Sequence, residues 1–276
     1  MLIHSRILGC GLAIVCGSVV AIAQETPAPV GAALTPQEIT SAARLDNFSI
    51  PTPGETLTAL SKHGKLDWAA KYRPPIATNY PSRPQMALNL GGLIADGYIA
   101  VEAEDTQQVK NIGRDISSLA KGLGVQREII DRGKSLEEKA QDKLWDTLKE
   151  ELEATQNEVK LAMADKNDSD LVALVTVGGW IRGMEVISGH IAQHYSEDAA
   201  KVLRQPAIVS FLRSKLEALP EKLRDDPAVK RTRMKLLEIE TTVAFPQDKA
   251  PTVDDVKKLN QLATDLSTDL AKKNLK

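Results

Sequence analysis

The run MALNLGGLIADGYIAVEA at residues 86–103 is the most apolar long stretch of the chain beyond its N-terminal segment, and it holds a Gly-Gly pair at 91–92. A second apolar run, LVALVTVGGWIRGMEVISGHI at residues 171–191, holds another Gly-Gly pair at 178–179. A glycine within a helix costs about 0.5–1 kcal/mol relative to alanine. Close approach of two backbones is the simplest compensation for that cost. The two runs therefore predict two buried central helices that pack through small residues.

The rest of the chain predicts helices around this central pair. Ser or Thr followed three residues later by Glu is typical of a helix start, and this pattern occurs at Thr35, Thr52 and Ser135. We expect a short helix to end at Gly133 and the helix that starts at Ser135 to continue to about residue 165. Residues 73–84 contain four prolines, which predict an extended crossing. Because the period-two alternation of a strand is absent, we expect an all-α fold, an irregular multi-helix bundle around the two Gly-containing apolar helices.

The N-terminus is typical of a secretory signal peptide. Arg6 precedes an apolar run at residues 7–23 that ends in the small-x-small cleavage sequence Ala-Ile-Ala. A lipoprotein signal is the alternative. However, Cys10 comes too early for a full apolar region, and Cys16 follows a valine where a small residue is needed. The sequence favours cleavage by the ordinary signal peptidase.

We therefore expect residues 1–23 to be a signal peptide, residues 24–34 a flexible leader and residues 35–276 a single all-helical domain, located in the periplasm or secreted. Both cysteines lie in the signal peptide, so the mature chain would have neither a disulfide nor a cysteine metal site. Losing Arg6 changes the formal charge from −2 to −3, which gives no electrostatic basis for binding nucleic acid. Charged residues interrupt both apolar runs, so we expect no transmembrane segment in the mature chain.

Three segments carry a resemblance to a known family: ALNLGGLIADGYIAVEAED at 87–105, LAKGLGV at 119–125 and VTVGGWIRGMEVI at 175–187. In these segments the chain resembles a family of secreted, all-helical bacterial proteins, some of them lipoproteins. The resemblance covers roughly the middle half of the chain and implies an exported helical fold. It implies no activity and no functional residue, because no activity is assigned to that family.

Polar residues on the two central helices form the first candidate site. Asn89 and Asp96 share one face of the first run, and Arg182 and Glu185 are three residues apart on the second. One hypothesis is a buried polar cluster that lines a ligand pocket between the helices. The alternative is a structural ion pair that sets the register of the helices, since an unpaired buried charge is costly.

Two histidines form the second candidate site. His190 and His194 are four residues apart, with Glu197 beyond them, and histidines at this spacing can share a metal ion. The residue after the first histidine is Ile191, so the glutamate that acts as general base in the zinc-protease helix is missing. The alternative is a pair of histidines near a helix end, where positive charge is favourable.

The proline-rich crossing carries aromatic and basic residues that suit a partner surface, namely Tyr72, Arg73, Tyr80 and Arg83. The alternative is that these side chains pack the crossing onto the bundle. The sequence contains no nucleophile elbow, phosphate loop or dinucleotide-binding pattern, and we expect no cofactor. We expect a non-catalytic soluble periplasmic protein that binds an unknown protein or small ligand; the alternative is a metal-dependent enzyme that uses His190 and His194.

Overall fold

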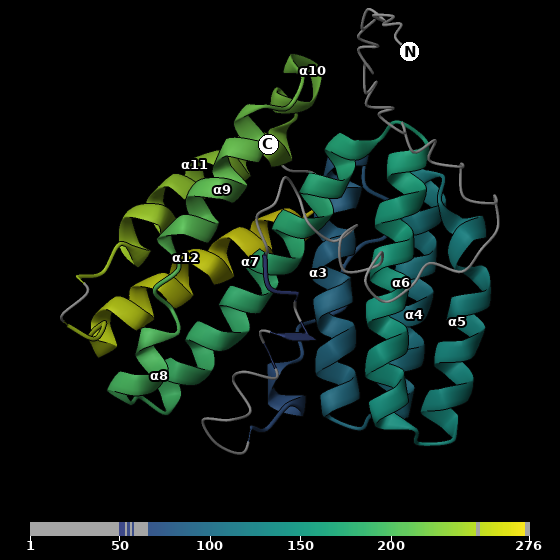
Figure 1. The fold of residues 1–276 in the computed structure, drawn as a ribbon, viewed down its shortest axis with the longest axis horizontal. Coiled ribbons are helices and arrows are strands. Elements are labelled where there is room, and N and C mark those ends of the chain that lie inside the picture. The colour runs from purple at the N-terminus through teal and green to yellow at the C-terminus, as the bar shows by residue number, and fades with distance from the viewer. Residues whose placement is uncertain (1–49, 53, 56, 58–65, 247–248, 274–276) are drawn as a thin grey trace, which may run out of the picture. The chain divides into compact units, whose positions relative to one another are not determined.

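The computed structural model describes residues 50–52, 54–55, 57, 66–246 and 249–273. The predicted signal peptide, leader and helix start at Thr35 lie outside the described residues. Every described helix belongs to one compact unit, residues 35–276. Within the described ranges the chain forms helices and no strand, so the predicted all-α class is confirmed (Figure 1).

The centre of the bundle consists of α3 (Arg83–Glu102) and α7 (Ser169–Gln193), which form the most extensive contact between helices. Ser82 caps α3 by accepting a hydrogen bond from the backbone N–H of Gln85, and Pro84 lies in the first turn. Both helices are buried on nearly all sides, as their apolar sequences predict.

Glycines place the two central backbones in direct contact. A Cβ atom at Gly91 would lie 1.9 Å from the carbonyl oxygen of Val175, and a Cβ at Gly178 would lie 1.8 Å from the carbonyl oxygen of Leu88. The predicted glycine-centred crossing is therefore confirmed at these two positions. Gly92 has a different neighbour, because its Cβ would lie 3.0 Å from the guanidinium of Arg73.

Three helices lie together next to α3: α4 (Thr106–Leu123), α5 (Gln126–Gln141) and α6 (Trp145–Asp165) (Figure 1). Gly124, with φ 80°, ends α4 in the left-handed conformation that glycine adopts easily.

The predicted boundaries of the next two helices were wrong. The expected stop at Gly133 lies inside α5, and the expected continuous helix from Ser135 breaks after Gln141. Lys143 adopts φ 57° there, and its backbone N–H donates to the carbonyl of Ala140. The break folds α6 back along α5, so apolar residues of both helices reach the core.

The C-terminal helices lie on the side of α7. They are α8 (Glu197–Lys201), α9 (Pro206–Glu217), α10 (Glu221–Arg224), α11 (Pro227–Val243) and α12 (Val253–Ala271). Thr252 and Asp255 form a complete capping box at the start of α12. α12 packs along α7, while α11 contacts both α12 and α9.

In the structure the crossing that precedes α3 comprises residues 69–82. It begins with the short 3-10 helix η1 (Ala69–Lys71). From Tyr72 the backbone is extended up to the start of α3, as the prolines predict. This crossing contacts α3 and α7, and it forms one wall of the site described below.

Candidate functional site

Asp96 lies at the centre of a buried ion network. Its Oδ2 accepts a hydrogen bond from Nε of Arg73 at 2.7 Å, and its Oδ1 accepts one from Nε of Arg182 at 2.7 Å. The three side chains are largely buried, with exposed fractions of 10%, 16% and 4% in the order Asp96, Arg73, Arg182. The predicted pairing of Asp96 with Arg182 is present, and the crossing adds a second arginine.

Arg182 also joins α7 to the crossing. Its Nη1 forms an ion pair with Glu185 at 2.9 Å, and its Nη2 donates to the carbonyl oxygen of Lys71 at 2.6 Å. Desolvation opposes the charge of Arg182, but Asp96 and Glu185 outweigh it and raise the pKa of Arg182. The network holds α3, α7 and the crossing in register, which is the structural role considered for these residues.

Asn89 does not join this network. Its amide nitrogen donates to the carbonyl oxygens of Gln85 and Leu270, at 2.9 and 2.8 Å. The side chain of Gln85 donates to Leu270 and to Lys272, at 3.0 and 2.8 Å. The two amides therefore bind the last carbonyls of α12, which a helix end leaves without partners. Asn89 faces another neighbour because seven residues separate it from Asp96, about two turns.

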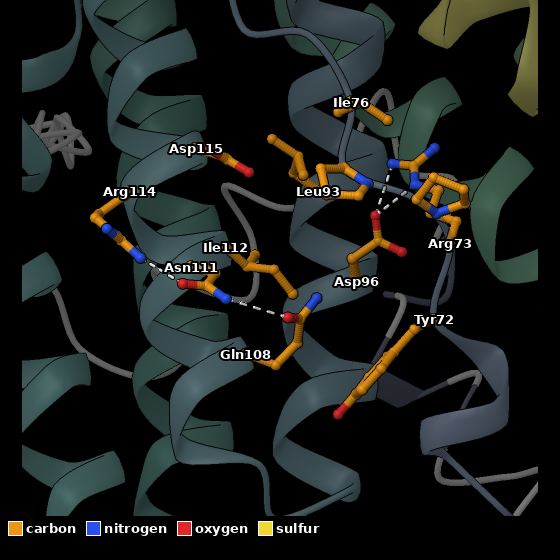
Figure 2. A pocket seen from close by; sticks show the side chains of 12 residues that line it. Tyr72, Arg73, Ile76, Leu93, Asp96, Gln108, Asn111, Ile112, Arg114 and Asp115 are labelled. Atoms are coloured by element: carbon orange, nitrogen blue, oxygen red, sulfur yellow. Dashed lines mark hydrogen bonds and ion pairs between the residues drawn. The ribbon is translucent and has the colours of Figure 1, made fainter.

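A pocket of about 350 Å³ opens beside the ion network, between the crossing, α3 and α4 (Figure 2). Its volume lies at the lower end of the range for small-molecule sites. The lining residues are Tyr72, Arg73, Pro74, Pro75, Ile76, Leu93, Asp96, Gln108, Asn111, Ile112, Arg114 and Asp115. The walls thus combine apolar side chains with a few polar ones, as ligand pockets typically do.

Most polar groups of the pocket already have partners. Both oxygens of Asp96 bind arginines, and Arg114 donates to Asn111 and to the carbonyl oxygen of Lys110 on its own helix. The hydroxyl of Tyr72 donates to Asp105 at 3.4 Å, and desolvation together with the Asp105 charge raises the pKa of this phenol.

Asp115 differs from these groups. Within the described part of the chain its carboxylate accepts no hydrogen bond and forms no ion pair. Desolvation raises the pKa of Asp115, and Arg114 only partly opposes that shift. A partly desolvated carboxylate without a partner in a pocket wall is available to a ligand. Asp115 is not among the residues predicted from the sequence, because one aspartate on an amphipathic helix gives no distinctive signal.

Two further buried polar side chains, Gln156 and Lys160, lie between α6 and the central helices. They are not among the site residues predicted from the sequence. Lys160 is 6% exposed, and among the described residues it donates no hydrogen bond and forms no ion pair. Oε1 of Gln156, one turn earlier, is also buried without a partner. Both line a cavity of about 20 Å³, close to the volume that holds one water molecule. Desolvation, partly opposed by Glu153 and Glu55, lowers the pKa of Lys160 to about 8.

The sequence did contain a signal for these two residues. Apolar residues recur every four positions from Leu136 to Leu152, and continuing that step reaches positions 156 and 160. Polar residues at positions that a stripe assigns to the core indicate a buried polar site.

The rings of His190 and His194 stack with their centroids 4.7 Å apart. Desolvation, His194 and Lys71 all lower the pKa of His190, which favours its neutral form. Glu197 is exposed in the first turn of α8. In the ranges that the structure describes, no group of three or more His, Cys, Asp or Glu side chains is arranged to hold a metal ion.

The four residues of the predicted partner surface all bind other parts of the chain. Arg73 and Tyr72 bind Asp96 and Asp105 as described, and the hydroxyl of Tyr80 donates to the carbonyl oxygen of Ala271 at 3.3 Å. Arg83 forms an ion pair with Asp168 at 2.6 Å and donates to the carbonyl oxygen of Leu123. These contacts correspond to the packing alternative.

Comparison with protein-family models, curated proteins and solved structures finds no match to this chain. Among the described helices, α7 alone has the length and apolar composition of a membrane span, and 89% of its most apolar window is buried within the protein. The core helix of a globular domain has the same properties.

Proposed function

We propose that this protein is a non-catalytic, exported binding protein whose ligand is a small molecule held between the crossing, α3 and α4. One observation supports the proposal most: a pocket of about 350 Å³ has an ordered ion network at one side and, in its wall, a carboxylate that has no partner among the described residues. The ion network holds the crossing against α3 and α7, so the pocket wall is formed before a ligand arrives. Preformed pockets of this kind are typical of ligand sites.

The composition of the pocket supports binding over catalysis. A nucleophile needs an adjacent base, and general acid–base chemistry needs two groups with separated pKa values. Both oxygens of Asp96 bind arginines, and within the described residues Asp115 forms no ion pair with a base. The metal-dependent alternative at His190 and His194 has no third His, Cys, Asp or Glu ligand among the described residues.

The proposal is tested by ligand-observed NMR screening of a fragment library, followed by mapping on backbone amide spectra. We expect hits that compete with one another for the pocket. They should shift the backbone amide signals of residues 72–76 and 108–115. The variant Asn111→Trp, which fills the pocket from its partly exposed wall, should abolish these shifts. The matched control Gln107→Trp, on the exposed side of the same helix, should retain them. A library without a hit at these residues would contradict the proposal.

A further inference from the structure

The polar groups of the pocket that remain available lie on one face of α4. Gln108, Ile112 and Asp115 are spaced at i, i+4 and i+7, so they follow one another along the same side of the helix. All three line the pocket, and Leu93 of α3 is part of the same lining (Figure 2). A ligand in the pocket therefore meets a polar group, an apolar middle and a second polar group in turn.

The two polar groups differ in chemistry. Oε1 of Gln108 accepts from Asn111 at 3.4 Å, whereas its amide nitrogen donates no hydrogen bond within the described residues. Asp115 offers a carboxylate, which when ionised only accepts hydrogen bonds. Figure 2 shows this carboxylate directed from α4 toward the α3 side of the pocket, while Arg114 points away. One end of the pocket thus offers a negative acceptor and the other end an amide donor.

The arginines of the pocket already bind neighbouring groups of the chain. Arg73 donates to Asp96 and to Ser267, and Arg114 is held by Asn111 and the carbonyl of Lys110. An anionic ligand would have to compete with these bonds and would approach the unpaired Asp115 carboxylate. A cation meets neither obstacle.

From this arrangement we infer that the pocket binds a small, elongated organic amine. Its ammonium group pairs with Asp115, its apolar middle lies over Ile112 and Leu93, and a carbonyl or hydroxyl oxygen at its other end accepts from Gln108. Seven residues of helix separate the two polar positions, a rise of about 10.5 Å, which sets the length of the ligand. This inference rests on the proposed function, since it names the ligand class for the same pocket.

Three probes of matched length test the charge preference: 6-aminohexanamide, heptanamide and the monoamide of adipic acid. They share an amide at one end and carry an ammonium, a methyl or a carboxylate at the other. Binding is followed by isothermal titration calorimetry and by amide shifts at residues 108–115. We expect 6-aminohexanamide to bind at least about tenfold more tightly than the other two, because a hydrogen bond to a charged group contributes most.

Variants separate the role of Asp115 from general electrostatics. Asp115→Asn should weaken the binding of 6-aminohexanamide by about tenfold and leave the binding of heptanamide unchanged. Asp131→Asn removes the same charge from a side chain that is 98% exposed on α5, and it should change neither affinity. Far-UV circular dichroism and a thermal melt establish that both variants are folded.

The outcomes distinguish this inference from the proposed function. The amine inference would be overturned if the carboxylate probe bound most tightly, or if 6-aminohexanamide bound Asp115→Asn and the wild-type protein with equal affinity. Either result would still show a pocket that binds small molecules. No binding by any of the three probes would also overturn the amine inference, and the fragment screen then decides the proposed function separately.

Discussion

Replacing Gly178 by alanine should destabilise this protein, although alanine is the better helix former. The added Cβ would lie 1.8 Å from the carbonyl oxygen of Leu88, about 1.5 Å short of the roughly 3.3 Å at which carbon and oxygen normally meet. The obstacle is backbone on a buried helix, so no side-chain rotation relieves it. α3 and α7 must instead separate along their whole interface.

The size of the effect follows from two opposing contributions. Overpacking of a well-packed core costs about 1–3 kcal/mol, and a clash with backbone belongs at the upper end of that range. A gap of 0.5–1 Å already forfeits about a quarter to a half of the dispersion energy between packed atoms. The higher helix propensity of alanine offsets about 0.5–1 kcal/mol of this cost. We therefore expect a net loss of about 2 kcal/mol, or a decrease of about 4–8 °C in Tm for a domain of this size.

Gly183→Ala is the matched control, because it adds the same methyl group to the same helix. A Cβ at Gly183 meets no atom within 4 Å, so only the helix propensity should change, and Tm should be equal or slightly higher. Gly113→Ala in α4 has equally open surroundings and should behave in the same way. Thermal melts followed by far-UV circular dichroism compare the three variants with wild type. A Gly178→Ala protein that melts at or above the wild-type temperature would refute the backbone contact.

Asp96, Lys160 and His190 are buried ionisable side chains whose replacement should change the stability. Asp96→Asn removes the carboxylate that pairs with both Arg73 and Arg182 and leaves Arg182 with Glu185 alone, so we expect a loss of about 3–5 kcal/mol in chemical denaturation. Lys160→Met should raise the stability at pH 7 by up to about 3 kcal/mol, because the buried lysine has no hydrogen-bond or ion-pair partner among the described residues. The wild-type protein should become more stable as pH rises from about 8 to 10.5, where the unfolded lysine still holds its proton, and Lys160→Met should remove that rise. The pKa of His190 is lowered in the fold, so stability should fall as pH drops through 6.5; urea titrations should show a smaller fall for His190→Gln.

The sequence contained enough information to predict the class of fold and its centre, because the cost of glycine in a helix demands compensation that only close packing supplies. It did not reveal which glycine of each pair faces the other helix, since neighbouring positions lie about 100° apart on a helix and the crossing angle decides between them. The break after Gln141 was missed for a related reason. A positive φ at Lys143 has no sequence signature, whereas Gly133 has one without ending a helix.

The candidate site was only partly predictable from sequence. The pair Asp96 and Arg182 followed from charges placed in apolar runs, but Arg73 came from a segment whose fold carries no periodic pattern. The pocket itself depends on how the crossing lies across α3 and α4, which no local pattern encodes. Asp115 differs from the neighbouring polar groups only in the structure, because most of those groups have hydrogen-bond or ion-pair partners there.

The amides of Gln85 and Asn89 also determine the order in which this chain can complete its fold. They bind carbonyl oxygens at positions 270 and 272, between 181 and 187 residues away, at the end of the chain. The first central helix, α3, therefore lacks part of its buried hydrogen bonding until α12 has been synthesised. Long-range closure of this kind slows folding, because the loop entropy is lost before the contacts form. During synthesis the bundle thus stays incompletely folded until α12 has emerged.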